Sequence, residues 1–336
     1  MPRRSWGVRV ARPMNADQPA AELDDSLSAY GAAYRRRQQQ RQRGAFDARE
    51  PNALLALFWT RYAASRGDES LVSTTAHVQD LLSEVFADEA QHDVGVDIAG
   101  LVSAASFGVL AMADPPSRAV ELAFQSGRST GAVRGLYGVA WRAYFLATAW
   151  RYFDWRQRPR VSAELQRRHA YLVERVTRET GHLRGLNLSQ LSRVLMLVSE
   201  IAVLLSDDDM LSHASAHMAE LVSLQRDDGS LPSAPGERAA PTAHLAQFSL
   251  AAHTAGQIDS SQKALAYIAR ERMDSARHLL TVADDAPRAE MSPWVPLALL
   301  TALDRHESAS PTEPQVEQLE ARGVHRWLRR GPRDRG

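Results

Sequence analysis

Apolar residues recur at helical spacing along almost the whole chain, and the period-two alternation of a half-buried strand is hard to find. The pattern therefore predicts an all-α protein. Some helical segments are apolar nearly all round, which is typical of helices that are covered on every side. Six segments of this kind span residues 52–64, 98–113, 134–150, 188–205, 242–256 and 292–303.

The segments between these apolar ones carry charge on one face, as in residues 162–179 and 261–280. An amphipathic helix keeps its charged face in water and buries the opposite face. We therefore expect an inner set of apolar helices, each followed by an outer amphipathic helix.

Short echoes indicate that one structural unit is repeated. Residues 67–82 align with 207–222 at an offset of 140, and TGAVRGL at 130–136 matches TGHLRGL at 180–186 in five of seven positions. HMAELVSLQRDDGSL at 217–231 aligns with residues 169–183 at an offset of 48. A period near 50 residues holds two helices and two turns, so each unit is a helical hairpin that its neighbours must cover. The pattern predicts about six hairpins closed into a double ring, with an open superhelix as the alternative.

Two acidic clusters coincide with the expected turns. Asp227 and Asp228 precede Gly229, a residue suited to positive φ, and we interpret this stretch as a turn. Asp207 to Asp209 are expected to cap the outer helix that follows. Because both clusters lie in turns, we expect no metal site and no cofactor.

The two ends of the chain differ from the middle. Residues 1–50 are polar and basic around AYRRRQQQRQRG, which indicates a flexible or peripheral arm. Residues 329–336 are expected to form a disordered basic tail. The helical ring is then expected to occupy residues 51–328.

The composition excludes several classes of function. The 40 basic and 40 acidic residues balance, so no overall field selects nucleic acid or a charged membrane. No cysteine is present, which removes disulfides, thiolate zinc sites and cysteine nucleophiles. The longest uncharged apolar run, at 98–113, is shorter than the roughly 20 residues that span a bilayer, and the first residues lack the apolar stretch of a secretory signal. We expect no membrane span and a cytoplasmic location; the oligomeric state stays open.

The run DDDMLSHASAHMAELVSLQRDDGSLP at 207–232 resembles the recurring unit of α/α-toroid proteins. Six-hairpin glycosidases and related lyases and epimerases show this unit most, and the pattern covers roughly residues 51–305. Lanthionine-synthetase-like and terpenoid-cyclase toroids share the architecture, but the zinc-binding cysteines of the former are missing. The resemblance implies a glycan-processing hydrolase, lyase or epimerase with a small-molecule or oligosaccharide substrate. A terpenoid-cyclase-like protein, and a noncatalytic toroid that binds a peptide or protein partner, are the alternatives.

In a toroid the turns that lead into the inner helices converge on one mouth, where helix N-termini present unsatisfied NH groups. Glycoside cleavage uses a pair of carboxyl groups, and the carboxylates nearest these turns are Asp93, Asp97 and Glu237, which we predict to be catalytic. Asp97 is equally suited to capping the helix that begins at residue 98. Substrate binding is predicted for the polar and aromatic residues at these turns, which are Asn52, Arg134, Tyr137, Trp141, His182, Arg184, Asn187, His244 and Trp294.

Overall fold

The structure is a computed structural model of the 336-residue chain. The residues that it describes are 18–41, 49–66, 133–149, 155–177, 186–232, 239–274, 279–280 and 292–308.

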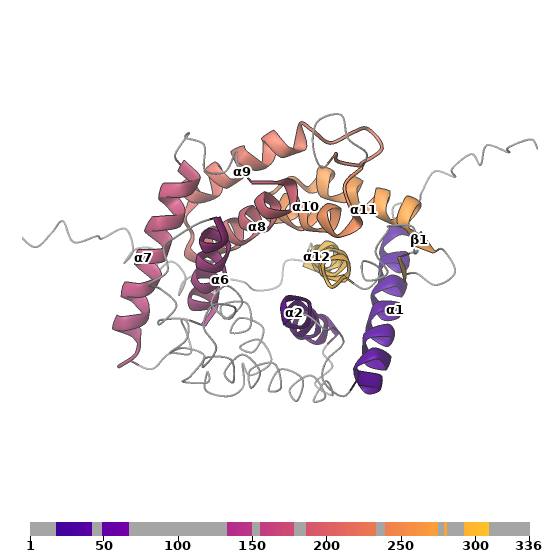
Figure 1. The fold of residues 1–336 in the computed structure, drawn as a ribbon, viewed down its shortest axis with the longest axis horizontal. Helices are drawn as coiled ribbons and strands as arrows, with labels where there is room; N and C mark the ends of the chain where they lie inside the picture. The colour runs from indigo at the N-terminus through magenta and orange to yellow at the C-terminus, as the bar shows by residue number, and fades with distance from the viewer. Residues whose placement is uncertain are drawn as a thin grey trace, which may run out of the picture.

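The inner, apolar helices contact one another in turn around the molecule (Figure 1). Helix α6 contacts α8, α8 contacts α10, α10 contacts α12, and α12 contacts α2. Polar side chains of α2 in turn reach α6 and α8, which brings the first and the later parts of the chain together. The bounds of these helices are α2 Arg49–Arg66, α6 Val133–Ala149, α8 Leu188–Leu205, α10 Thr242–Thr254 and α12 Trp294–Ser308.

A second series of helices lies outside the first (Figure 1). Helix α7 contacts α6 and α9, α9 contacts α8, and α11 contacts α10 and α12. The outer helices span α1 Gln18–Arg41, α7 Arg158–Thr177, α9 Asp208–Val222 and α11 Ile258–Arg272. The double arrangement of inner and outer helices that the sequence pattern predicts is therefore present.

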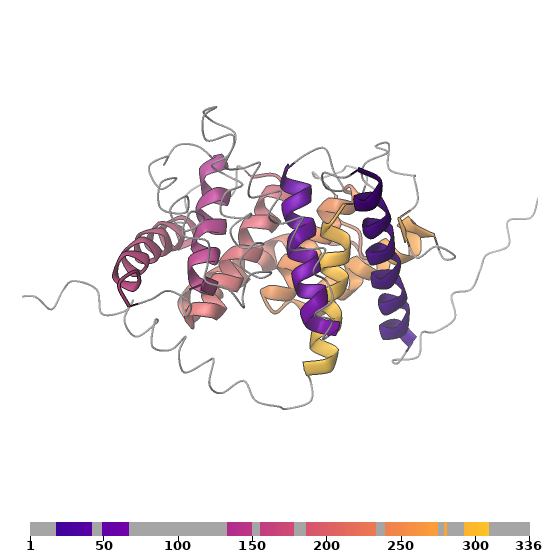
Figure 2. The same ribbon diagram turned by 90° about the horizontal axis from the view of Figure 1, so that it is seen from below.

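Helix α1 lies within the segment predicted to be a flexible or peripheral arm. It stands at the outside of the ring beside α12 (Figures 1 and 2), but Leu27, Tyr30 and Tyr34 are fully buried. The Tyr34 ring meets Phe58 of α2 edge-on, with 5.6 Å between ring centroids. The described part of this segment, residues 18–41, is thus a packed helix at the periphery of the ring, because three large side chains on one face bury against α2 and α12.

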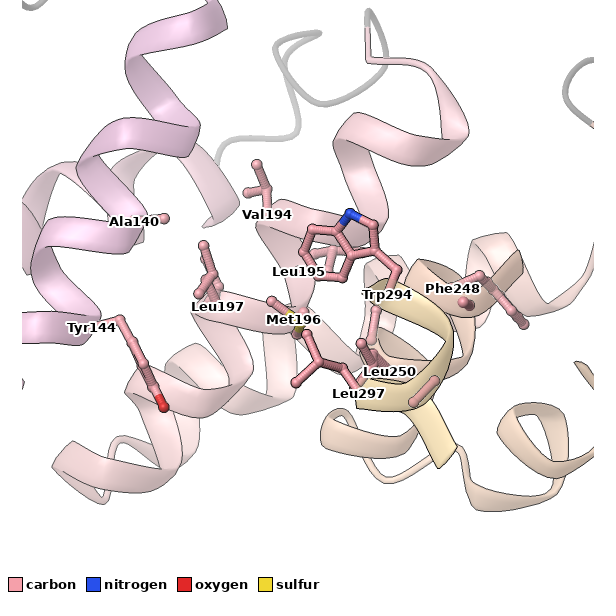
Figure 3. Packing of buried hydrophobic residues seen from close by; sticks show 14 of the residues in the cluster. Ala140, Tyr144, Val194, Leu195, Met196, Leu197, Phe248, Leu250, Trp294 and Leu297 are labelled. Carbon is pink, nitrogen blue, oxygen red and sulfur yellow. The ribbon is translucent and has the colours of Figure 1, made fainter. Parts of the chain in front are cut away.

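The core lies between the inner helices. Trp294, at the start of α12, belongs to the same buried cluster as Leu195 and Met196 of α8 and Phe248 and Leu250 of α10 (Figure 3). Burying each side chain of this size stabilises the fold by about 1.5–3 kcal/mol relative to exposure. The apolar faces of the inner helices therefore hold the ring together.

The turn at residues 225–231 confirms the interpretation of the Asp-Asp-Gly-Ser stretch. Gly229 has a φ of 90°, and the Asp228 carboxylate accepts a hydrogen bond of 2.9 Å from the Ser230 amide. A β-carbon at residue 229 would lie 2.1 Å from the carbonyl oxygen of Lys263. The glycine is required both for the backbone conformation and for the close approach of α11.

The predicted cap at 207–209 is also confirmed, and one helix end differs from the prediction. Asp207 is the N-cap of α9 and accepts from the Met210 amide at 3.0 Å. Helix α11 ends at Arg272, whereas the sequence pattern extends it to residue 280. Instead, the two-residue strands β1 (Met273–Asp274) and β2 (Leu279–Leu280) pair in antiparallel fashion.

Helix α8 is long and apolar enough to cross a membrane by length and composition alone. Two thirds of it, 67%, is buried inside the protein, where it contacts α6, α9 and α10. This burial is what a core helix of a helical ring shows.

Candidate functional site

Helix α2 meets α6 and α8 through polar side chains at two levels. Glu50, Tyr137 and Arg193 meet at one level, and Arg61, Tyr144 and Glu200 meet at the other. Along each of the three helices, the residue of the first level comes earlier in the sequence. The three helices therefore run in the same direction, and the first level lies nearer their N-terminal ends. We call that end of the ring the mouth.

The mouth level contains an ion pair whose carboxylate also accepts a hydrogen bond from a tyrosine. Arg193 Nη1 donates to Glu50 Oε1 at 2.9 Å, and Tyr137 Oη donates to the same oxygen at 3.2 Å. The Arg193 guanidinium lies over the Tyr137 ring, 4.6 Å from its centroid. Burial and the neighbouring Glu50 carboxylate raise the pKa of Tyr137, so its hydroxyl stays protonated and donates to Glu50 at neutral pH.

His244, on a fourth inner helix, lies within the electrostatic influence of Arg193. It lies in the first turn of α10 and is partly buried. Burial, followed by the positive charge of Arg193, lowers the pKa of His244 below its ordinary value. The imidazole is therefore neutral at pH 7 and offers one donor and one acceptor nitrogen.

Arg193 does not use all of its hydrogen-bond donors within the described part of the chain. Its Nε is buried and has no partner there, although its side chain as a whole is 20% exposed. A buried donor without a partner costs about 1–3 kcal/mol. The guanidinium therefore keeps donor capacity that its contact with Glu50 does not use.

At the deeper level, α2 and α8 form a second ion pair. Here α2 supplies the cation and α8 supplies the carboxylate, the reverse of the mouth level. Arg61 Nη2 lies 3.2 Å from both carboxylate oxygens of Glu200 and donates to Tyr144 Oη at 3.2 Å. Burial alone lowers the pKa of Arg61, but Glu200 and Tyr144 outweigh it and raise that pKa above its ordinary value. Burial and then Glu200 raise the pKa of Tyr144 to about 12. Arg61 is thus ionised and Tyr144 is neutral at pH 7.

Trp141 separates the two levels along α6. Its indole meets Tyr137 and Tyr144 edge-on, with centroid distances of 6.1 and 5.7 Å. Because Trp141 is only 1% exposed, it forms part of the wall between the levels. Of the three aromatic residues in this row, Tyr137 is the one nearest the mouth.

The arrangement of the helices is similar to that of solved carbohydrate-active structures. Unsaturated glucuronyl hydrolase from Bacillus sp. GL1 matches with a TM-score of 0.58 and 11% identity, over 87% of this chain and 97% of that chain. A possible GH105 family member from Klebsiella pneumoniae matches with a TM-score of 0.59 and 11% identity, over 91% and 100%. A UGL variant with dGlcA-Glc-Rha-Glc matches at 0.58 and 11%, over 87% and 97%.

This chain has the α/α-toroid fold. The resemblance stated from the repeat unit is therefore confirmed at the level of architecture, of the type seen in six-hairpin glycosidases. At the level of sequence, no family model and no curated protein matches. Identity of 11% shows the fold alone, because one fold can host many different chemistries.

The toroid places three of the predicted binding residues at or beside the mouth cluster. Tyr137 belongs to the cluster itself, and Trp141 lies directly behind Tyr137. His244 lies close enough to Arg193 for that charge to lower its pKa. Arg134 lies in the first turn of α6, but its side chain is outside the described residues. The predicted residues Asp93, Asp97, His182, Arg184 and Glu237 also lie outside the described residues.

The remaining predicted binding residues lie at structural positions: two are buried and one caps a helix. Asn52 is buried in the first turns of α2, and Trp294 is buried in the core with 5% exposure. Asn187 is the N-cap of α8: its side chain accepts from the Gln190 amide at 2.9 Å, and the Gln190 side chain accepts from the Asn187 amide at 3.2 Å. A reciprocal capping box of this kind satisfies two helix N-terminal donors.

Sequence reasoning missed the charged residues that build both levels. Glu50 precedes the predicted start of the first inner helix. Arg61, Arg193 and Glu200 lie within segments that were interpreted as apolar, so they were not predicted as site residues. A signal was available, because Arg193 and Glu200 are the only charged residues of α8 and are seven positions apart. Isolated charges on one face of a buried helix need partners on a facing helix.

Two further features of the described residues concern ligands. Within the described ranges, no group of three or more His, Asp or Glu residues is placed to hold a metal ion. A cavity of about 470 Å³ lies beside α1 and α2, away from the mouth, and is lined by Ser28, Gly31, Ala32, Arg35, Arg36 and Tyr62. It lacks a carboxylate among these residues, so the mouth cluster is the stronger candidate for acid–base chemistry.

Proposed function

We propose that this toroid is a glycan-processing enzyme that acts on an acidic oligosaccharide. The observation that carries the proposal is the convergence of Glu50, Tyr137 and Arg193 from three inner helices at the mouth. His244 of α10 lies near enough for the charge of Arg193 to lower its pKa. The named activity of a protein with the same fold, unsaturated glucuronyl hydrolase, supports a uronate-bearing substrate. The classes compatible with the site are hydrolase, lyase and epimerase.

Each mouth residue has a role that follows from its chemistry. The Arg193 guanidinium is suited to a planar carboxylate such as that of a uronate, because its donors form a fork that matches two carboxylate oxygens. Tyr137 supplies an aromatic face and a protonated hydroxyl. The neutral His244 can hydrogen-bond a sugar hydroxyl as donor or acceptor.

Glycoside hydrolysis needs a second carboxyl group in addition to Glu50. The separation of the two groups decides the outcome, since about 5–5.5 Å permits retention and about 6.5–9.5 Å permits inversion. Asp93, Asp97 and Glu237 stay the predicted candidates for this second group. The proposal thus assigns Glu50 and one of these three residues as the acid–base pair.

The test is an activity screen on oligosaccharides that end in an unsaturated glucuronyl residue, with neutral oligosaccharides of the same length as controls. Mass spectrometry in heavy-oxygen water separates the classes, because a hydrolase incorporates solvent oxygen into its product whereas a lyase or an epimerase does not. We expect Glu50→Gln to lower kcat by about 100-fold or more. Asp259→Asn, on the exposed start of α11, should leave kcat unchanged.

A screen in which no acidic oligosaccharide is turned over, while the protein is folded by circular dichroism, would contradict the proposal. The terpenoid-cyclase-like alternative needs an apolar centre to guide a hydrocarbon chain, and the ion pairs at both levels favour a polar ligand instead. The predicted cytoplasmic location stays a prediction, which cell fractionation tests.

A further inference from the structure

The contact between Arg193 and Glu50 joins one guanidinium nitrogen to one carboxylate oxygen. A single carboxylate oxygen, Glu50 Oε1, accepts from both Arg193 Nη1 and Tyr137 Oη. Within the described residues, the buried Arg193 Nε has no partner. The guanidinium therefore holds its carboxylate through one nitrogen, although its geometry permits a two-bonded pair.

Glu50 is also accessible and replaceable. Its side chain is 34% exposed, and it lies in the first turn of α2. If Arg193 were taken by another carboxylate, Glu50 would keep its hydrogen bond from Tyr137. The exchange would replace a contact through Nη1 alone by a two-bonded contact through Nη1 and Nη2.

The deeper level holds α2 in place while the mouth contact changes. Arg61 of α2 is bound to Glu200 of α8 and Tyr144 of α6. Since the two contacts lie at separate points along the same helices, release of Glu50 from Arg193 does not release α2 from the ring. The exchange can therefore be local.

We propose that Glu50 occupies the place of a ligand carboxylate on Arg193, and that binding of an anionic ligand displaces Glu50 and frees it to act on that ligand. The inference rests on the proposed function, because it takes the ligand to be an acidic sugar. It adds that a neutral sugar leaves Glu50 paired with Arg193. The enzyme would then select acidic substrates both by binding them and by releasing its own carboxylate only in their presence.

Competition for Arg193 makes a specific prediction about binding. Removing the charge of Glu50 removes the competitor, so Glu50→Gln should bind D-glucuronate more tightly than the wild-type chain does. We expect a gain of about tenfold, which corresponds to about 1.4 kcal/mol. Binding of D-glucose should change little. Isothermal titration calorimetry on the full chain measures both sugars.

Two further variants complete the test. Arg193→Met should lose the preference for D-glucuronate over D-glucose, and Asp259→Asn should match the wild-type chain. Circular dichroism and thermal unfolding show that each variant is folded. If Arg193→Met fails to fold, Arg193→Lys replaces it, because the charge remains but the fork that binds two oxygens is lost.

The inference is overturned if Glu50→Gln binds D-glucuronate no more tightly than the wild-type chain, or if neither binds it. The proposed function fails separately. If Glu50→Gln tightens D-glucuronate binding but the wild-type chain turns over no oligosaccharide, the exchange stands in a noncatalytic anion-binding toroid. If oligosaccharides are turned over without that tightening, the exchange is wrong and the enzyme assignment stands.

Discussion

Arg61 of α2 and Glu200 of α8 form an ion pair whose polarity is opposite to that of Glu50 and Arg193 on the same two helices. Helix α2 therefore contributes an acid at the mouth and a base deeper in the ring, and α8 contributes the reverse. A shift of α2 that exchanged the levels would place like charges together. The two pairs thus favour one register of α2 in the ring, as well as joining residues far apart in the sequence.

Breaking the deeper pair should destabilise the protein. Arg61→Met leaves Glu200 largely buried without its cation, and we expect a loss of about 3 kcal/mol in the free energy of unfolding. The double variant Arg61→Met with Glu200→Gln should lose less than the sum of the two single changes. Urea unfolding followed by circular dichroism measures these values.

The exposed pair Arg270 and Glu271 provides the matched control for the deeper pair. Both side chains are about half exposed, at 52% and 49%, and Arg270→Met should cost less than about 1 kcal/mol. Equal losses for Arg61→Met and Arg270→Met would show that the deeper pair has no special role in holding α2.

His244 should report on the charge of Arg193. Burial and Arg193 together lower the pKa of His244, so Arg193→Met should raise that pKa toward its ordinary value without fully restoring it. Titration by nuclear magnetic resonance of the imidazole protons measures the change. Arg270→Met, on the outer helix α11, should leave the His244 pKa where it is in the wild-type chain.

The same shift has a consequence for stability at low pH. Because the pKa of His244 is lower in the folded than in the unfolded chain, the unfolded state binds a proton first as the pH falls. The contribution of His244 to stability is thus lost as the pH falls from the unfolded pKa through the lower folded one. His244→Gln should make the unfolding midpoint less sensitive to pH between about 7 and 5. An unchanged pH dependence would contradict this assignment.

Gly229 and Gly256 allow the cost of backbone strain to be measured apart from the cost of a steric clash. Gly229 and Gly256 have φ values of 90° and 83°, but only at Gly229 would a β-carbon meet the Lys263 carbonyl, at 2.1 Å. Gly256→Ala should cost about 1–2 kcal/mol, because an L-residue is strained at positive φ. Gly229→Ala should cost clearly more, and equal losses in thermal unfolding would contradict the close approach of α11.

The role of Asn187 can be tested by variants that keep its helix cap but change its side-chain amide. Asn187→Ala should destabilise the protein by about 1 kcal/mol, because the capping box of α8 is lost. Asn187→Asp keeps the cap and should retain stability and turnover if capping is the role of this residue. A selective rise in KM for Asn187→Asp would instead support the predicted contact with substrate.

The repeat junctions show how much of this fold is encoded locally. The stretch at 225–231 combines a side chain that bonds its own turn with a glycine at positive φ, and both features act within a few residues. The same holds for the cap at Asp207 and for the all-round apolar character of α8 and α10. Local signals of this kind predicted the all-α class, the hairpin unit and the inner and outer helices.

The mouth cluster could not be predicted in the same way. Glu50 and Arg193 are 143 positions apart, and Arg61 and Glu200 are 139 apart. Nothing in the neighbourhood of either residue identifies its partner. Tyr137 and His244 lie in the first turns of α6 and α10, and their roles as site residues stay predictions. Trp294 also begins an inner helix, but it is buried in the core, where α12 packs against α10 and α1.

By itself, the sequence determined which segments are helices, which of them are inner, and where the turns between them fall, because spacing of apolar residues, caps and turn glycines act over short distances. Tertiary structure alone decided that α1 is a packed helix and that α2 bonds to α6 and α8 with opposite charges at two levels. These contacts depend on how the ring closes, and closure is set by the packing of all the helices together.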